Sequence, residues 1–245
     1  MTTDTDLSLR AVNRGDVVLL SPAGRLDLST YVGMRDGLLK HVAEQPHAVV
    51  VVLGPDLELG SDPLASVFAA VWMRCCRWPG VPLMLVATTE RHRGMLKRTG
   101  LGRFVPCHDR LDTALALATA PARRHRNEMQ LPADTDAPHL ARDFARRTCL
   151  KWNLRDAGPR TVLLAGELVE ITRAHTSSAL VLRIERFPDQ LTVAVRHTGP
   201  SPRAAGRRLD LTRIHRLSTA CGNTPTLDEG RVLWAAIGIC SDGRA

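Results

Sequence analysis

The feature that most constrains the fold is an alternation of strand-like and helix-like segments in the first half of the chain. The apolar run at residues 48–53 is typical of a buried strand. After it, Pro63 favours a helix start, and residues 64–75 carry apolar side chains at helical spacing. Strand-like segments recur at residues 17–26, 81–87 and 104–105, and helix-like segments at residues 31–43, 90–99 and 110–120. This alternation predicts an α/β unit in which helices cover a sheet.

The second half of the chain orders its segments differently. Two helix-like segments come first, at residues 139–152 and 160–175. Two strand-like segments follow, at residues 179–186 and 191–197. A helix-like segment at residues 209–220 and a strand-like segment at residues 231–239 come last. Helices that are segregated from the strands predict an α/β two-layer sandwich.

Residues 121–138 separate the two patterns. They combine proline, small residues and charges without a hydrophobic period, which predicts a linker. We therefore expect two α/β domains, at residues 8–120 and 139–243.

Composition excludes several classes of protein. With 44% hydrophobic and 24% charged residues, the 245-residue chain has the composition of a soluble globular protein. Its longest apolar run is far shorter than the ~20 residues of a membrane-spanning helix, and residues 1–9 are too acidic and polar for a signal peptide. We expect a cytoplasmic protein without a membrane partner. No metal site is predicted, because the six cysteines contain no Cys-x-x-Cys pair.

The net charge of +8 is unevenly distributed. Residues 1–120 hold 13 basic and 12 acidic residues, whereas residues 139–245 hold 17 basic and 10 acidic residues. This asymmetry favours an acidic partner for the second half. We do not expect a nucleic-acid partner, because the basic loop that contains Arg203 and Arg207 has no interleaved aromatic residues.

Short motifs in the first half occur in an order that is typical of one family. They are Gly24-Arg25-Leu26-Asp27, Gly60-Ser61-Asp62-Pro63-Leu64 and Thr99-Gly100-Leu101. On these motifs, residues 14–120 resemble a STAS domain, the fold of bacterial anti-sigma factor antagonists. In that family the middle loop reads Asp-Ser-Ser-Gly-Leu, and a partner anti-sigma kinase phosphorylates its second serine. The resemblance therefore implies such a kinase as a partner.

In this chain the phosphoacceptor position holds Asp62, and Ser61 occupies the position before it. An aspartate cannot accept a phosphoryl group by serine chemistry. Two interpretations of Asp62 stay open. Its carboxylate, at a helix N-terminus that favours anions, could imitate the phosphorylated, released state. Alternatively, Asp62 is a helix N-cap that accepts a backbone N–H.

Motifs of the second half match another family. They are Glu167-Leu168-Val169 with His175, Val193-Ala194-Val195-Arg196 with Gly199, and Gly230-Arg231-Val232-Leu233-Trp234-Ala235. On these motifs, residues 139–240 resemble the histidine-kinase-like ATPase domain of anti-sigma serine kinases. That family uses a glutamate to polarise the nucleophile, an asparagine to ligate Mg²⁺, an aspartate to bind adenine, and glycines to approach the phosphates. Glu167 matches the glutamate.

The other chemical positions of that family are altered in this chain. The asparagine position holds Ile171, which offers no oxygen to a hard cation. The aspartate position holds His197, although Gly199 of the same motif is retained. In the phosphate motif, Gly206 is retained in one register, and Arg208 replaces a glycine in both possible registers. The resemblance therefore implies an ATPase-type framework without phosphoryl transfer.

We expect a regulatory protein of the bacterial partner-switching type, with a STAS domain fused to a degenerate histidine-kinase-like ATPase domain. It would act by protein–protein binding, with no catalytic residue and no cofactor. Expected partners are an anti-sigma factor or kinase, or the chain's own C-terminal domain in cis. The alternative is an active anti-sigma serine/threonine kinase that phosphorylates a STAS protein, with ATP and magnesium held by Glu167, Gly199 and the arginines of the basic loop.

Overall fold

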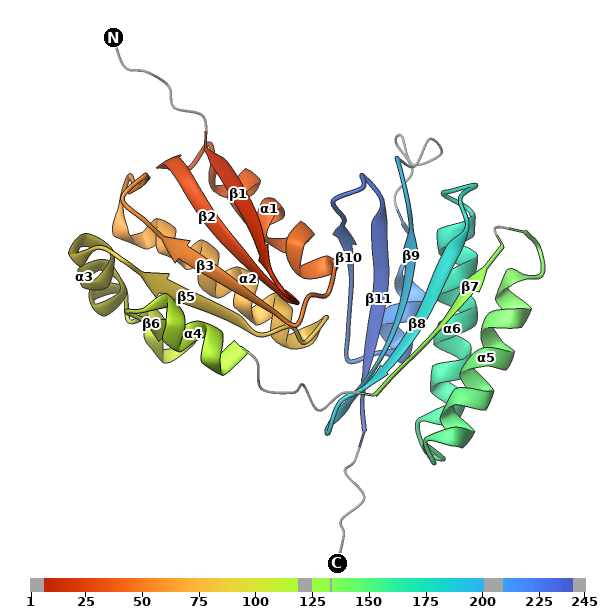
Figure 1. Ribbon diagram of the computed structural model, residues 1–245. Coiled ribbons are helices and arrows are strands. Elements are labelled where there is room, and N and C mark those ends of the chain that lie inside the picture. Colours follow the sequence, from red (N-terminus) through yellow and green to blue (C-terminus); the bar gives the residue numbers. More distant parts are fainter. Residues whose placement is uncertain (1–6, 119–124, 133, 201–208, 240–245) are drawn as a thin grey trace, which may run out of the picture. The chain divides into compact units, whose positions relative to one another are not determined.

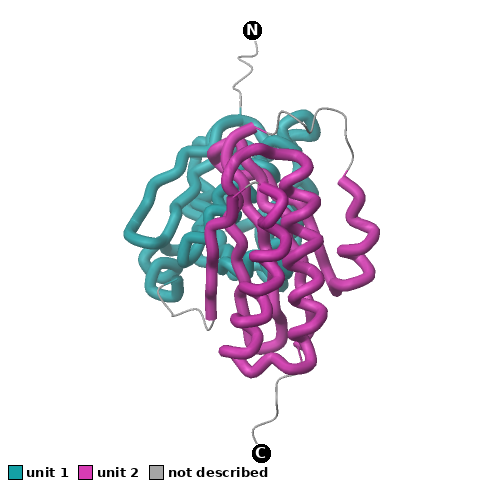
Figure 2. Tube along the Cα trace, turned by 90° about the vertical axis from the view of Figure 1, so that its right-hand side faces the viewer, with its two compact units in different colours: residues 1–122 teal, residues 123–245 magenta. Residues whose placement is uncertain are grey.

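The computed structural model describes residues 7–118, 125–132, 134–200 and 209–239. The chain divides into two compact units, Met1–Ala122 and Arg123–Ala245, named unit 1 and unit 2 (Figure 2). Each unit has hydrophobic cores built from its own residues. No helix in the described part of the chain is long and apolar enough to cross a membrane.

Unit 1 contains a six-stranded sheet (Figure 1). The strand order is β1-β2-β3-β5-β6, and β4 pairs with β2 outside this path. β1 is antiparallel to β2, whereas all the other pairs are parallel. The strands are β1 (Ser8–Arg14), β2 (Val17–Leu26), β3 (Ala48–Leu53), β4 (Leu57–Leu59), β5 (Leu83–Ala87) and β6 (Cys107–His108).

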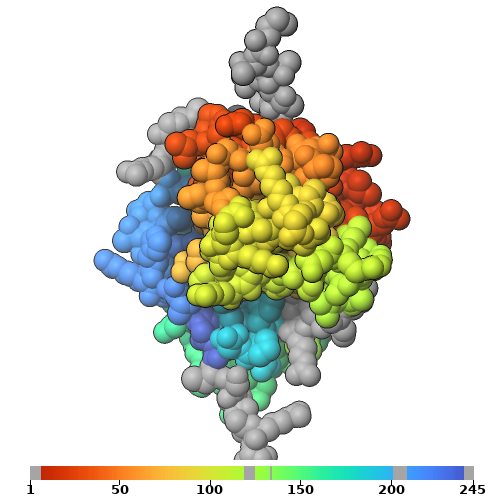
Figure 3. Space-filling model, turned by 90° about the vertical axis from the view of Figure 1, so that its left-hand side faces the viewer, coloured from red at the N-terminus to blue at the C-terminus, as the bar shows by residue number. Residues whose placement is uncertain are grey.

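Helices cover both faces of this sheet, because its central strands are apolar on both sides. Val49 and Val51 of β3 belong to the core that α1, α2 and α3 share. Val50 points to the opposite face, where it packs in a smaller core with Ala114 of α4. Figure 3 looks onto the side of unit 1 on which α3 (yellow) and α4 (yellow-green) lie. The helices are α1 (Tyr31–Ala43), α2 (Ser66–Arg77), α3 (Glu90–Thr99) and α4 (Leu111–Ala118).

Unit 2 is a two-layer sandwich of an antiparallel sheet and helices (Figure 1). The strand order is β10-β11-β9-β8-β7. One core joins the sheet to the helices, with Leu168 of α6 packed among Val193 of β9 and Leu233 of β11. These contacts agree with the prediction that this half is a two-layer sandwich of a sheet and helices. The elements are β7 (His125–Leu131), α5 (Ala137–Lys151), α6 (Gly158–Arg173), β8 (Leu180–Arg186), β9 (Gln190–His197), α7 (Thr212–Leu217), β10 (Ala220–Pro225) and β11 (Arg231–Gly238).

The segment expected as a linker, residues 121–138, contains ordered structure instead. Residues 125–131 form β7, an edge strand of unit 2, and α5 already begins at Ala137. Met129 and Leu131 of β7 pack against the core, and Asn127 donates a hydrogen bond to Thr148 of α5 (2.8 Å). Only two apolar residues mark the buried side of this strand. That is too few to produce a recognisable hydrophobic period.

The helix expected at residues 209–220 is also shorter in the structure. α7 ends at Leu217, and Ala220–Pro225 forms β10, which pairs with β11. The sequence of β10 contains glycine, asparagine and proline, which disfavour strands. Its strand conformation therefore comes from pairing with its neighbour at the edge of the sheet, where proline is tolerated.

Three details of unit 1 also differ from the sequence expectation. Strand β1 is not anticipated, because its residues are mostly polar and exposed. The short strand expected at residues 104–105 lies at Cys107–His108. The middle helix begins with a 3-10 turn, Asp62–Ala65, before α2 continues from Ser66.

Candidate partner-binding site

Two loops of unit 1 meet where β2 and β4 end. Arg25 lies opposite Glu58 in the parallel pairing, and its guanidinium donates to the Glu58 carboxylate (2.8 Å). Just beyond these strands, the Gly60 N–H donates to the carbonyl oxygen of Leu26 (2.9 Å). A Cβ on Gly60 would lie only 3.3 Å from that oxygen, so glycine favours this close approach. The loop before α2 is thereby fixed beside the loop after β2.

Asp27 organises the loop between β2 and α1. Its carboxylate accepts hydrogen bonds from the Ser29 hydroxyl (2.6 Å) and from the backbone N–H groups of Ser29 (2.8 Å) and Thr30 (3.2 Å). These bonds, that of the Ser29 hydroxyl above all, hold the pKa of Asp27 below its ordinary value. The Thr30 hydroxyl donates to the carbonyl oxygen of Arg25 (2.9 Å). The loop is thus closed on itself, with Leu28 at its tip and 85% exposed.

An ion pair fixes Asp62. Arg98 of α3 donates from Nε to Oδ2 (2.7 Å) and from Nη2 to Oδ1 (3.2 Å). The hydrogen bonds from this guanidinium lower the pKa of the Asp62 carboxyl, which is therefore ionised at neutral pH. The N-cap position of the 3-10 turn belongs to Ser61, whose side chain makes no capping hydrogen bond. The interpretation of Asp62 as a helix N-cap is wrong.

Exposed apolar side chains occur beside these two loops. Val32 in the first turn of α1 is exposed, as is Leu28 before it, and Met73 on α2 is 54% exposed. The hydroxyl oxygens of Tyr31 and Ser66 lie 3.3 Å apart, so the first turns of α1 and α2 are neighbours. Met73 follows Ser66 by two helical turns and shares its helix face. We name this set the loop surface: Leu28, Val32, Ser61, Asp62, Ser66 and Met73.

In unit 2, the residues expected at a nucleotide site have other contacts. The Glu167 carboxylate on α6 accepts a hydrogen bond from Arg213 of α7 (2.9 Å) and forms an ion pair with it. Ile171, one turn later, packs against the core of the unit. Its carbonyl oxygen lies 2.8 Å from Nδ1 of His175. Position 171 thus offers a metal ion no side-chain oxygen, and the nearby carboxylate is paired with a guanidinium.

His197 and Gly199 lie at the end of β9, in a tightly packed turn region. His197 is buried, and this burial lowers the pKa of its imidazole. Its Nδ1 has no hydrogen-bond partner among the described residues. Gly199 adopts a φ of 72° and donates its N–H to the carbonyl oxygen of Asp228 (3.1 Å). Gly230 touches the same segment, because a Cβ built on it would lie 2.1 Å from the His197 carbonyl oxygen.

The structure therefore brings some of the sequence-predicted site residues together, and others lie outside the described part of the chain. Ser61 and Asp62 lie together at the start of the 3-10 turn, and Glu167 and Ile171 lie one turn apart on α6. Gly206 and Arg208 lie outside the described residues. Sequence reasoning missed Arg98, which comes 36 residues after its partner and belongs to no motif. The nearest signal is the glycine at position 100, which ends α3 with a φ of 65°.

No protein-family model and no curated protein matches the chain. Solved structures do match. The crystal structure of an anti-sigma factor antagonist from Mycobacterium paratuberculosis is 24% identical, covering 49% of this chain and 98% of that chain, with a TM-score of 0.42. The anti-sigma factor antagonist SpoIIAA in its unphosphorylated form is 14% identical, covering 47% of this chain and 98% of that chain, with a TM-score of 0.36.

Proposed function

We propose that this chain is a regulatory protein of the bacterial partner-switching type. In this proposal, unit 1 binds an anti-sigma factor through the loop surface, and unit 2 binds protein partners without transferring phosphate. One observation carries the proposal. The position that holds a phosphoacceptor serine in the STAS family holds Asp62 in this chain, and Arg98 pairs with it through two hydrogen bonds.

This ion pair bears on which state of a STAS antagonist Asp62 imitates. A phosphoserine carries a charge of about −1.5 to −2 at neutral pH. Asp62 carries a single negative charge, and the guanidinium of Arg98 compensates it. The position is therefore close to neutral in sum, as an unphosphorylated serine would be. We infer that unit 1 is held in the partner-binding state and that a kinase cannot release it at position 62.

The form of the loop surface supports a protein partner. Leu28 and Met73 leave large apolar side chains exposed to solvent, as surfaces that bind a protein partner do. Charged side chains lie beside them, with the Arg25–Glu58 ion pair exposed to solvent, as at a polar rim. The hydrogen bonds of Asp27 order the loop before any partner arrives. Such order lowers the entropic cost of association.

For unit 2, the proposal is a binding function on an ATPase-type framework. Two contacts support it: the ion pair of Glu167 with Arg213, and the packing of Ile171 against the core. Mg-ATP would have to break the ion pair and replace the missing ligand at position 171. Residues 139–245 hold 17 basic and 10 acidic residues. This excess of positive charge favours a partner with an acidic protein surface.

Replacing Arg98 by alanine should weaken the complex with the anti-sigma factor by about tenfold, because it exposes an unpaired carboxylate on the loop surface. The measurement is biolayer interferometry with the full-length chain, against the kinase-type anti-sigma factors of the source genome taken one at a time. The double variant Arg98→Ala with Asp62→Asn removes the exposed charge as well. It should recover most of the lost affinity.

Lys97→Ala is the matched control for this experiment. Lys97 precedes Arg98 on α3 and is exposed, so its removal changes the net charge equally without uncovering Asp62. Equal losses for the two single variants would contradict the role of the ion pair. Failure of the unaltered chain to bind any of the anti-sigma factors would contradict the proposed function itself.

Titration of the full-length chain with Mg-ATP should give no saturable heat, corresponding to a Kd above about 1 mM. The reason is the missing oxygen at position 171 together with the engaged carboxylate of Glu167. Isothermal titration calorimetry measures this directly, with an active anti-sigma kinase as the positive control. A micromolar Kd that depends on magnesium would overturn the proposal for unit 2 and favour the kinase alternative.

A further inference from the structure

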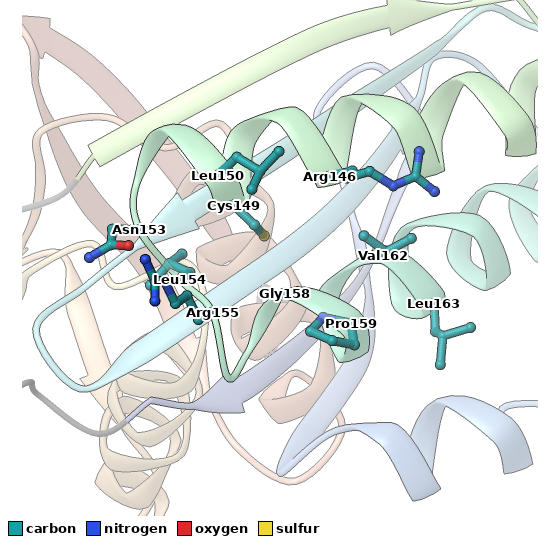
Figure 4. Close-up of a pocket in the computed structure, with 10 residues that line it drawn as sticks. All are labelled: Arg146, Cys149, Leu150, Asn153, Leu154, Arg155, Gly158, Pro159, Val162 and Leu163. Atoms are coloured by element: carbon teal, nitrogen blue, oxygen red, sulfur yellow. The ribbon is translucent and has the colours of Figure 1, made fainter.

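A cavity of about 680 Å³ lies between the C-terminal end of α5 and the N-terminal end of α6 (Figure 4). Its volume is in the range of small-molecule sites, about 300 to 1,000 Å³. It contains neither a residue of the loop surface nor a residue of the expected nucleotide site. The lining residues used below are Arg146, Cys149, Leu150, Arg155, Val162 and Leu163.

The walls of this cavity are mainly apolar. In Figure 4 the Cys149 side chain points into the space between the two helices. Burial raises the pKa of its thiol, so this group stays uncharged at neutral pH. Val162 contributes a further apolar wall from α6. Leu150 on α5 is 75% exposed and Leu163 on α6 is 51% exposed, so each helix leaves a large apolar side chain in solvent beside the opening.

The charged side chains of the lining are both cationic. Arg146 on α5 donates a hydrogen bond to Asp143, which compensates part of its charge. Arg155, on the loop at one end of the cavity (Figure 4), has no hydrogen bond or ion pair within the described part of the chain. No acidic residue lines the cavity. Across residues 137–163 there are six basic and two acidic residues, so the surroundings are cationic too.

From this arrangement we propose that the α5–α6 cavity binds an amphiphile that joins an unbranched apolar chain to a single carboxylate. The apolar chain lies along Cys149 and Val162 and covers Leu150 and Leu163. The carboxylate is held at the loop end by the guanidinium of Arg155, in a charge-assisted hydrogen bond that a planar guanidinium makes well with a carboxylate. This proposal is independent of the function proposed for either unit.

The test is isothermal titration calorimetry of the full-length chain with decanoate, kept below its micellar concentration. We expect saturable binding with one decanoate per chain. Arg155→Ala should weaken this binding by about fivefold to tenfold. Leu163→Glu, which adds a carboxylate at an exposed position beside the opening, should weaken it as well. Decyltrimethylammonium, with the same chain length and the opposite charge, should show no saturable binding.

Arg147→Ala is the matched control, because Arg147 lies on the same helix, is exposed and is not part of the lining. It should bind decanoate as the unaltered chain does. Circular dichroism establishes that each variant is folded before it is titrated. Absence of saturable binding by the unaltered chain would overturn the proposal. Equal affinity of the unaltered chain, Arg155→Ala and Leu163→Glu would overturn it too, because decanoate would then bind elsewhere.

Discussion

Replacing Gly230 by alanine should destabilise unit 2 by about 4 kcal/mol or more, among the largest effects of a single methyl group. The added Cβ would lie 2.1 Å from the carbonyl oxygen of His197. The backbone of residue 230 fixes the position of the Cβ, and the oxygen belongs to the backbone of His197, so no side-chain rotation relieves the contact. The turn has little room to move, because Gly230 also donates its N–H to Asp228 (3.2 Å) and accepts a hydrogen bond from Thr226 (3.1 Å).

Hydrogen exchange followed by peptide mass spectrometry measures this effect in each unit separately. Peptides from β9 and β11 should lose protection in Gly230→Ala, whereas peptides from β3 and β5 should keep it, because the cores of the two units share no residue. Gly238→Ala, at the far end of the strand that follows Gly230, is the matched control, since a Cβ there meets no atom within 4 Å. A variant at position 230 as stable as this control would contradict the close contact with His197.

Replacing Phe68 by alanine should destabilise unit 1 by about 3 to 5 kcal/mol. Phe68 lies in α2, is fully buried and belongs to the main core of the unit. Removing its ring leaves a cavity between α2 and the sheet that the surrounding side chains fill only in part. Urea unfolding, followed by hydrogen exchange of peptides from β3 and β5, measures the loss in this unit, because tryptophan fluorescence would also report Trp152 and Trp234 of unit 2.

Met73→Ala is the control for this substitution, because Met73 is on the same helix but exposed. It should change the stability of unit 1 by less than about 0.5 kcal/mol. The same variant is expected to weaken binding to an anti-sigma factor, since Met73 belongs to the loop surface. Stability and binding are therefore separable on one helix. Comparable losses of stability for both variants would contradict the assignment of Phe68 to the core.

The buried elements of unit 1 could be predicted from the sequence because their hydrophobic patterns are strong. β3 is a continuous apolar run, and α1 and α3 have the bounds that their periodicity predicts. Edge strands could not be predicted. β1, β7 and β10 are mostly polar or contain glycine and proline, and they are strands because a neighbour offers them backbone hydrogen bonds. Such pairing depends on residues far away in the chain.

The candidate site was predictable only in part, for a similar reason. Motif order points to Ser61 and Asp62, and the resemblance of the second half implies that position 171, an isoleucine, offers a metal ion no oxygen. It does not reveal that Arg98 pairs with Asp62, because the side chains that meet come from two helices in different parts of the chain. The interpretation of Asp62 as a helix N-cap was wrong because it did not include this ion pair. A carboxylate at a helix start has several competing partners, and only tertiary structure decides among them.

The polar character of β1 has a consequence for the behaviour of this protein at high concentration. β1 is an outer strand of its sheet, so one side of its backbone pairs with no strand among the described residues of unit 1. Arg10, Asn13 and Arg14 occupy exposed positions along it. Two positive charges would face the same charges of another molecule that tried to extend the sheet by pairing with β1. β1, which the hydrophobic pattern does not predict, therefore carries charges that disfavour amyloid-like self-association.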